Sequence, residues 1–446
     1  MPIVKPSLKK IFTVINVACF IGLYVSPASG QTALSREDQL LLEKIERDSI
    51  EYFLRHSDRK TGLTQDSSRA GSPASIAATG FSLASLAIAQ SHGWIPPSKA
   101  YEQIRQTLQT LRDEAHHENG FFYHFLDPKT GKRVWRSEAS SIDTALLLAG
   151  ALLAAQYFEG TDIPRLVQGL YERVNWKWMM NGTSLVCHGW KPESGFLPYY
   201  WDSYNELLIL QALAIGASKN PAPPEAWDAW DRLEDEYRGK RIVYSPTGSL
   251  FTYQYAQAFI DFRGLRDRGI NYFENSRKAS LANWEYSLSF KERYLTYSEL
   301  SWGLTASLGP GGYRAYGAKP GLGLHDGTVA PAASIGSLVF TPEFSLPTLK
   351  FFYERHRNSL YGPWGFKNAF NLNKNWWSPE YLGIDQGISV LMLENFLFRG
   401  SVWKKFMELP AIQTWIERCG LREDYSRRRN RRARREAVSS TNSRVK

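Results

Sequence analysis

The sequence predicts an all-α protein built as one large domain. About twelve apolar or amphipathic stretches of helical length alternate with loops over roughly 380 residues. Strand-like stretches do not alternate with helical ones as in an α/β protein, and the chain has no sharp internal repeat. Many helical hairpins with substantial loops indicate an (α/α) barrel, whose functional site lies where the loops gather at one end.

Caps, breakers and apolar periodicity define the helices of the N-terminal half. Ser35 and Asp38 form a capping pair before an amphipathic stretch, and Gly93 with Pro96-Pro97 separates the second helix from the third. Residues 120–135 carry an Asp-Pro-Lys-Thr-Gly turn between aromatic runs, which predicts a short β-hairpin at the end that holds the site. The predicted helices in this half are 35–55, 74–90, 98–115, 141–155, 163–179 and 203–217.

Proline and glycine divide the C-terminal half. Residues 248–264 form an aromatic stretch to which no helix is assigned. Residues 302–331 hold too much Gly and Pro for regular structure, yet they are dense in Tyr, Trp, His and Asp, as functional loops often are. The predicted helices in this half are 226–238, 272–292, 332–339, 345–357, 385–398 and 402–416.

Residues 1–30 resemble a secretory signal peptide. Three lysines precede an apolar run over residues 11–25, and Ala28-Ser29-Gly30 is a small-residue cleavage site before Gln31. The apolar run is short for a membrane span. We therefore expect an exported protein, periplasmic or secreted, with no membrane span after cleavage and a catalytic barrel domain over residues 31–420.

The net charge of +10 comes from the two ends of the chain. The signal contributes three lysines, and residues 427–446 hold eight Arg and one Lys against one Glu, so the body between them is close to neutral. Residues 421–446 are therefore predicted to form a basic, disordered tail, and no nucleic-acid partner is expected. Cys187 and Cys419 remain after signal cleavage, either bonded to each other or as free thiols. Oligomeric state is not predicted.

Several chemistries are excluded by their missing motifs. Gly321-Leu-Gly323 follows no strand and lacks the third glycine of a dinucleotide loop. The mature chain has no Walker loop and no Gly-x-Ser-x-Gly elbow. His116-His117-Glu118 has neither the spacing nor the Cys partner of a metal motif. We therefore expect no cofactor and no metal ion.

The stretch from Trp135 to Ala155 places two carboxylates at the mouth of an apolar helix. Ser140 or Ser141 is a natural N-cap, and Asp143 falls in the first turn, where the helix dipole favours an ionised carboxylate. The helix is apolar nearly all round, which indicates burial. Taken alone, this stretch predicts either an ordinary capped core helix or, with Glu138, a site for acid–base chemistry.

Carboxylates lie beside aromatic residues several times in this chain, in which 14% of residues are aromatic. Glycoside hydrolysis needs one protonated and one ionised carboxyl group, and sugars are held by aromatic faces and hydrogen-bonding side chains. The candidate catalytic residues are Glu206, Asp143 and Glu138. The candidate substrate-binding residues are Trp135, Trp190, Asp202, Tyr204, Arg263, Trp302, Tyr313, Tyr316, His325, Asp326, Asp385, Gln386 and Glu394.

The expected environments of the carboxyl groups suggest their roles. Glu206 is expected about one turn inside an apolar helix, where desolvation favours the protonated form and so the role of acid. Asp143 or Glu138 is then the base, or the group that positions water.

Eight motifs in one order resemble the glucoamylase-like family of exported bacterial proteins, which includes endo-β-1,2-glucanases of glycoside hydrolase family 144. They are GFSLASLAIA with GW, SEASSIDTALLLAGALLAA, GWKPESGFLPYYWDSYNELLILQALAIG, LFTYQYAQAFIDFRG, WGLTAS, GYRAYGA, HDGTVAPAASIGSLVFTPE and IDQGISVLMLEN. The resemblance covers about Ser35 to Trp415. It implies an (α/α)6 barrel and an inverting mechanism without metal. Related domains also occur in proteins that build or remodel cyclic β-1,2-glucans.

The sequence therefore predicts an exported glycoside hydrolase that acts on an oligo- or polysaccharide, namely β-glucan. The favoured activity is endo-cleavage of β-1,2-glucan with inversion. Two alternatives remain open: a non-catalytic glycan-binding protein on the same barrel, and a transglycosylase or lyase that acts on related glucans.

Overall fold

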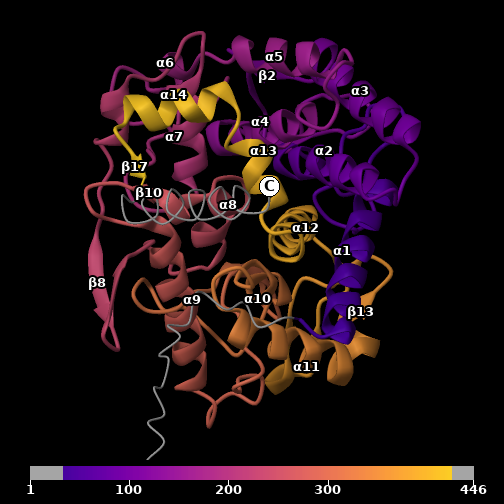
Figure 1. Ribbon diagram of the computed structural model, residues 1–446, viewed down its shortest axis with the longest axis vertical. Coiled ribbons are helices and arrows are strands. Elements are labelled where there is room, and N and C mark those ends of the chain that lie inside the picture. Colours follow the sequence, from indigo (N-terminus) through magenta and orange to yellow (C-terminus); the bar gives the residue numbers. More distant parts are fainter. Residues whose placement is uncertain (1–33, 424–446) are drawn as a thin grey trace, which may run out of the picture.

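The computed structural model describes residues 34–423 and is rich in helices, which confirms that part of the predicted fold class (Figure 1). The signal peptide predicted for residues 1–30 and nearly all of the tail predicted for residues 421–446 lie outside the described residues. No helix in the described range is both long enough and apolar enough to cross a membrane. Cys187 and Cys419 are free thiols.

Six helices of the described chain form a closed inner ring, in which each helix contacts the next and the last contacts the first. Nearly every residue of these helices is buried, because each one packs on ring neighbours and on an outer layer. α10 is the shortest, and α8 also contacts α12. The inner helices are α2 (Ile76–Ser91), α4 (Ser141–Ala155), α7 (Leu207–Gly216), α8 (Phe251–Phe259), α10 (Pro331–Gly336) and α12 (Gly383–Leu397).

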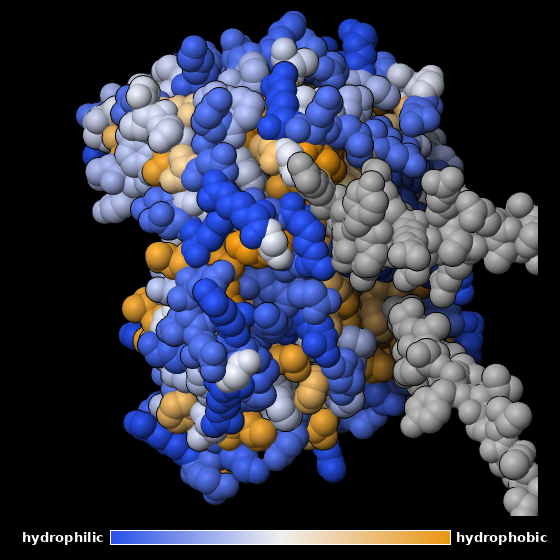
Figure 2. Space-filling view, turned by 60° about the vertical axis from the view of Figure 1, so that its left-hand side comes forward, coloured by the Kyte–Doolittle hydropathy of each residue, from blue (hydrophilic) through white to orange (hydrophobic). Residues whose placement is uncertain are grey.

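Amphipathic helices cover the outside of the ring, with buried residues on one face and exposed charges on the other. Among the described residues, this layer comprises α1 (Arg36–His56), α3 (Pro97–Asp113), α5 (Ile163–Arg173), α9 (Tyr272–Leu288), α11 (Pro342–Leu360) and α14 (Pro410–Arg418). The short helices are α6 (Trp176–Met179), α13 (Ser401–Phe406), η1 (Pro224–Trp227), η2 (Phe262–Gly264) and η3 (Leu372–Lys374). The face in Figure 2 is mostly hydrophilic, with hydrophobic residues in small groups between polar ones.

Two glycines allow α2 and α4 to pack closely. A Cβ atom on Gly150 would lie 1.9 Å from the carbonyl oxygen of Gly80, and one on Gly80 would lie 2.5 Å from the carbonyl oxygen of Leu146. Only residues without a side chain fit such a crossing. The tight packing fixes α4, whose first turn carries Asp143, against its neighbour in the ring.

The strands are short, and their pairings within the described chain are antiparallel. They are β1 (Ala74–Ser75), β2 (His117–Glu118), β3 (Phe121–Phe122), β4 (Phe125–Leu126), β5 (Ala139–Ser140), β6 (Gly189–Lys191), β7 (Gly195–Phe196), β8 (Glu234–Tyr237), β9 (Lys240–Val243), β10 (Leu265–Arg266), β11 (Ala306–Gly309), β12 (Gly312–Ala315), β13 (Tyr361–Gly362), β14 (Gly365–Phe366), β15 (Phe370–Asn371), β16 (Trp376–Trp377) and β17 (Arg422–Glu423).

The structure corrects several predicted elements. Residues 234–243 form the β8–β9 hairpin instead of part of a helix, because Arg238 and Gly239 both take positive φ and make its tight turn. α8 occupies the aromatic stretch to which no helix was assigned. The helix predicted over 402–416 is divided before Pro410, and the one over 163–179 is interrupted after Arg173.

The hairpin predicted around the Asp-Pro-Lys-Thr-Gly turn is only partly right. Asp127 does organise the turn, since its side chain accepts from the backbone N–H groups of Lys129 and Thr130. However, the aromatic strand before it, β4, pairs with β1, and only a single bridge joins Leu126 to Arg133 across the turn. Residues 302–331, predicted to be irregular, contain the β11–β12 hairpin.

Candidate active site

The N-terminal ends of all six inner helices converge on one cavity of about 890 Å³. That volume lies within the range of ordinary small-molecule sites. Each helix contributes residues from its first turns, or the residue just before it. The lining residues from the ring are Ala77, Ile142, Asp143, Leu146, Glu206, Phe251, Gln254, Tyr255, Ala332, Ala333, Ile384, Asp385 and Ile388.

Loops and the β11–β12 hairpin form the rim of this cavity. The hairpin contributes Leu308 and Tyr313, and the turn before α4 contributes Trp135. Trp135 is 69% exposed and Tyr313 is 57% exposed, so both rings are open to solvent. Aromatic rings in this position can stack on sugar rings. The loop over residues 66–72 and Glu380 complete the rim.

Three carboxyl groups in the cavity have raised pKa values. Burial raises the pKa of Glu206 to about 7, and the nearby charge of Asp143 adds to this effect. Burial also raises the pKa of Asp385 to about 7, although its carboxylate accepts a hydrogen bond of 2.6 Å from Asn368. Burial together with the charges of Asp143 and Glu380 raises the pKa of Asp66 to about 6. These groups can therefore hold protons near neutral pH.

Glu206 does not lie inside a helix as predicted. It occupies the N-cap position of α7 in helical φ/ψ and has no capping hydrogen bond. The half-buried side chain reaches the cavity from there. The expected direction of its pKa shift is nevertheless found, because the cavity wall desolvates the carboxyl group.

Asp143 is fixed at the start of α4 by the predicted cap. The hydroxyl of Ser140 accepts from the backbone N–H of Asp143 at 3.2 Å and donates to Asp143 Oδ2 at 2.5 Å. This leaves Oδ1 of Asp143, which lies 3.6 Å from Nε2 of His124. The carboxylate is therefore oriented by groups on both of its oxygens.

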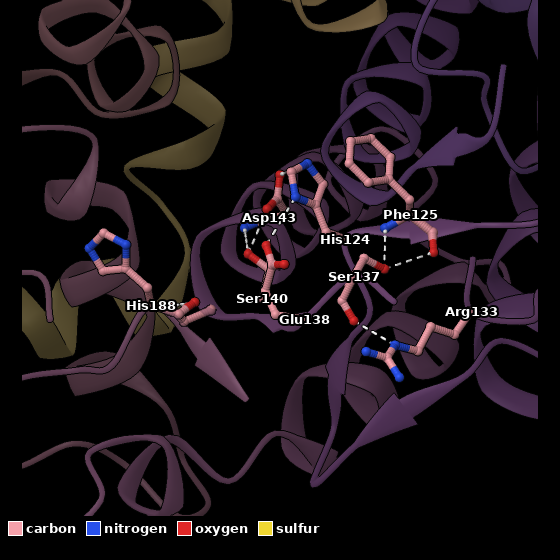
Figure 3. Close-up of polar contacts among 9 residues, drawn as sticks. His124, Phe125, Arg133, Ser137, Glu138, Ser140, Asp143 and His188 are labelled. Atoms are coloured by element: carbon pink, nitrogen blue, oxygen red, sulfur yellow. Dashed lines mark hydrogen bonds and ion pairs between the residues drawn. The ribbon is translucent and has the colours of Figure 1, made fainter. Parts of the chain in front are cut away.

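His124 lies between Glu138 and Asp143, and its ring points toward both carboxylates (Figure 3). Nδ1 lies 3.1 Å from Oε1 of Glu138. Although burial disfavours an imidazolium, the charges of Asp143 and Glu138 raise the pKa of His124 to about 9. The hydrogen bond to His124 lowers the pKa of Glu138 to about 2, against the opposing effect of burial.

These three side chains each offer an atom that could bind a cation, and the atoms lie within 4.8 Å of one another. Without a bound cation the His124 ring is protonated at neutral pH, because its pKa is raised to about 9, and both of its nitrogens are then donors that face carboxylates. We therefore describe His124, Glu138 and Asp143 as an ion-pair group.

The structure brings five of the predicted site residues together in the cavity. They are the candidate catalytic residues Glu206 and Asp143 and the candidate binding residues Trp135, Tyr313 and Asp385. Glu138 does not line the cavity and contacts it through His124. The other candidates lie elsewhere.

Three of the aromatic residues predicted to stack on sugars are buried in the core, which corrects their placement. Trp302 is fully buried, and Tyr204 packs among the rings of Tyr253, Tyr272 and Trp230. Tyr316 is buried too, and its hydroxyl donates to Asp326 at 2.8 Å. The sequence motifs could not separate core rings from surface rings, because large aromatic side chains serve both purposes.

Three further candidates make internal contacts and do not line the cavity. Asp326 accepts from the hydroxyl of Tyr316 and from the backbone N–H of Thr328. Gln386 donates to the carbonyl oxygen of Phe366. His325 packs against four aromatic rings, those of Tyr286, Phe290, Tyr294 and Tyr297.

The remaining candidates also lie away from the cavity. Glu394 is in the last turns of α12, where it accepts from Ser401 and pairs with His92 at 2.9 Å. Arg263 follows α8, and it pairs with Asp261 and lies over the ring of Trp403. Trp190 packs against Trp178, and Asp202 is exposed.

Sequence reasoning missed Asp66, His124 and Glu380, all of which line the cavity. Asp66 lies in a polar loop with no local signal, and Glu380 precedes α12 in an irregular segment. His124 was hidden among the aromatic residues of β3 and β4. An acidic residue just before an apolar inner helix, as at Glu206 before α7 and Glu380 before α12, was the one usable signal.

Comparison with known proteins connects this arrangement to a family. The Glycoamylase family, described as "Putative glucoamylase", matches residues 198–410. A crystal structure from Bacteroides uniformis with the same description superposes with a TM-score of 0.82 at 29% identity, over 88% of this chain and 99% of that chain. The predicted resemblance to the glucoamylase-like family is confirmed.

Two proteins similar to this chain carry more specific names. The endo-β-1,2-glucanase from Chitinophaga pinensis, solved with sophorotriose and glucose, has a TM-score of 0.81 at 27% identity, over 87% of this chain and 98% of that chain. An exo-β-1,2-glucooligosaccharide sophorohydrolase (non-reducing end) from Parabacteroides distasonis is 27% identical over 427 residues, 87% of this chain. The alignment spans 58% of the length of that relative.

Proposed function

We propose that this protein is a glycoside hydrolase that cleaves β-1,2-glucan, as an endo-acting enzyme with inversion of the anomeric centre. The observation that carries the proposal is the pairing of Glu206, with its pKa raised to about 7, with the capped Asp143 in one cavity rimmed by exposed aromatic rings. Such a pair of carboxyl groups in different environments suits acid–base hydrolysis. The names of the two β-1,2-glucan relatives support the linkage.

In the proposed mechanism Glu206 is the general acid. Its raised pKa keeps a proton available near neutral pH, which it donates to the leaving glycosidic oxygen. Asp143 is the general base that activates water on the opposite face of the sugar. Asp385, which also lines the cavity, is the next candidate for the base. Trp135 and Tyr313 hold neighbouring sugar rings at the rim.

Three broader proposals accompany this function. The inner ring and outer layer together make an (α/α)6 barrel, supported by the closed sequence of helix contacts. Residues 31–420 form one catalytic domain. The third proposal is that the protein is exported to the periplasm or secreted, which the charge, apolar run and cleavage site in residues 1–30 support. Mass spectrometry of the exported protein should find an N-terminus near Gln31, and an intact Met1 would contradict this.

Incubation with a panel of β-glucans of defined linkage tests the function. Reducing ends should accumulate on β-1,2-glucan and little on β-1,3- or β-1,4-glucan. New reducing ends exclude a binding protein, and their absence despite a change in chain length would indicate a transglycosylase. Products that absorb in the ultraviolet would indicate a lyase. Proton NMR of the first anomer formed tests inversion.

The product distribution separates endo-cleavage from the second candidate, exo-release of disaccharides. The Parabacteroides distasonis relative favours that alternative by its name. Endo-cleavage gives a ladder of oligosaccharides early in the reaction and a rapid fall in mean chain length. Sophorose as the sole early product would replace the endo proposal by the exo one.

A further inference from the structure

His124 holds a position that the hydrolytic pair itself does not explain. Its backbone is fixed on both sides, since its N–H donates to the carbonyl oxygen of Glu138 at 2.8 Å and its carbonyl oxygen accepts from Ile76 at 3.1 Å. Its ring stacks on Phe125 with 3.9 Å between centroids and 15° between planes. The ring therefore has little freedom to turn away from the cavity that it lines.

The two nitrogens of this fixed ring face different carboxylates. Nδ1 lies 3.1 Å from Glu138, which is outside the cavity wall, and Nε2 lies 3.6 Å from Asp143, which is inside it. A neutral imidazole has one N–H donor and one acceptor, so it would place a lone pair against one of the two carboxylates. Only the doubly protonated ring makes favourable contacts with both.

The charges that surround His124 agree with this protonation state. Glu138 and Asp143 face its two nitrogens, and Asp66 is the third carboxylate that interacts with it. The combined charges raise the pKa of His124 to about 9 despite burial. At neutral pH the cavity thus contains a fixed positive charge beside Asp143 and near Asp66.

We propose that His124, held as an imidazolium by Glu138, is the positioning residue that stabilises the negative charge of Asp143 and orients its carboxylate toward the reacting sugar. The proposal rests on the proposed function, in which Asp143 is the base. It also reassigns Glu138, which acts through His124 and not on the substrate. Without the cation, Asp143 would face the like charge of Asp66 with no compensating positive charge beside it.

A substrate-free experiment tests the charge state. The chain has eight histidines, so selective ¹³C labelling of the histidine rings gives few NMR signals. His124, assigned by its loss in His124→Gln, should titrate near pH 9 in the wild type and move toward its ordinary value of 6.5 in Glu138→Gln. A wild-type pKa near 6.5 would overturn the proposal whether or not the protein cleaves glucan.

Stability adds a second readout that needs no substrate. Because folding raises the pKa of His124 above 6.5, its contribution to stability is full below pH 6.5 and is lost as the pH rises through 9. Wild-type stability should therefore decline over that window, and the decline should be smaller in His124→Gln. Equal pH dependence in the two proteins would contradict a charged His124.

The catalytic readout is the pH profile of kcat/KM on β-1,2-glucan. A neighbouring positive charge favours the ionised form of a carboxyl group, so His124→Gln should move the acidic limb of this profile to higher pH. At pH values below the acidic limb, kcat/KM should then fall about tenfold for each pH unit by which the limb moves. An unmoved limb in a folded His124→Gln protein would overturn the positioning role.

Two controls distinguish this role from a structural one. His92→Gln removes another histidine–carboxylate pair, in which His92 lies 2.9 Å from Glu394 and away from the cavity. This variant should leave the acidic limb of the kcat/KM profile unchanged. The double variant His124→Gln/Glu138→Gln should have the profile of His124→Gln alone, because Glu138 acts through the ring. If the shifts of the acidic limb in the two single variants added up in the double variant, Glu138 would act directly and not through His124.

Discussion

Replacing Glu206 by Gln should remove most of the activity and at the same time stabilise the fold at alkaline pH. The two side chains are nearly equal in size, but the amide cannot supply the proton that the leaving oxygen needs. Loss of an acid–base residue typically lowers the rate about 10²–10⁴-fold. We expect a kcat loss in that range on β-1,2-glucan, with glucan binding retained.

The stability change follows from the pKa of the carboxyl group. Burial raises it from the ordinary 4.5 to about 7, so the folded state binds the proton more tightly than the unfolded state does. This contribution to stability is full below pH 4.5 and is lost as the pH rises through 7. The difference corresponds to about 3 kcal/mol. At pH 8 the uncharged Gln variant should exceed the wild type in stability by up to about that amount.

Two measurements check this pair of effects. Urea unfolding at pH 5 and pH 8 gives the free energy of unfolding of each protein, and the advantage of Glu206→Gln should grow with pH. A substrate with an activated aryl leaving group should restore much of the lost rate, since such a group departs without protonation. Asp143→Asn serves as the control: it should lose a similar rate, and the aryl substrate should not restore it.

Either of two results would refute the reasoning. Equal relative stabilities at pH 5 and pH 8 would mean that Glu206 is not desolvated in the folded protein. Near-normal turnover of both variants would place the catalytic pair elsewhere in the cavity, with Asp385 as the first alternative.

The remaining predictions concern packing, the rim and the tail. Gly150→Ala should destabilise the fold by about 1–3 kcal/mol, because the added Cβ would meet the backbone of α2. Gly169→Ala, on the exposed face of α5, is the control and should be neutral or stabilising; thermal unfolding measures both. Tyr313→Ala should raise KM with little change in Tm, because its ring is exposed at the rim. Tyr316→Ala should lower stability by about 3 kcal/mol or more, because its ring is buried. The reverse pattern would make Tyr316 the substrate-contacting ring and Tyr313 the core ring. Deletion from Arg427 onward should leave turnover of neutral glucan almost unchanged, and a large loss of activity would show that the tail matters.

The helices and their caps were the most predictable part of this protein, because their signals are local. Ser35 and Ser140 cap the helices that the sequence assigns to them, and the apolar run of α4 is buried all round as expected. Errors occurred where two local signals competed. Residues 226–238 carry helix-forming residues, yet the turn at Arg238 and Gly239 gives a hairpin.

The site was less predictable, because it depends on distances between segments far apart in the chain. Glu138 and Asp143 are five residues apart, yet only Asp143 lines the cavity, and no local pattern indicated the histidine that lies between them. Asp66 and Asp385 reach the same cavity from opposite parts of the sequence. Tyr204 and Trp302 belong to loop motifs with polar neighbours, but tertiary packing buries them.

The common direction of the inner helices has a consequence for protein engineering. Because all six begin at the cavity, the segments that precede them set the shape of the rim, while the connections that follow them lie at the far end of the ring. α4, for example, carries its C-terminus about 22 Å from its first turn. The exposed connection at Glu159 and Gly160 thus offers a place for new chain termini or an inserted domain that leaves the rim of the cavity untouched.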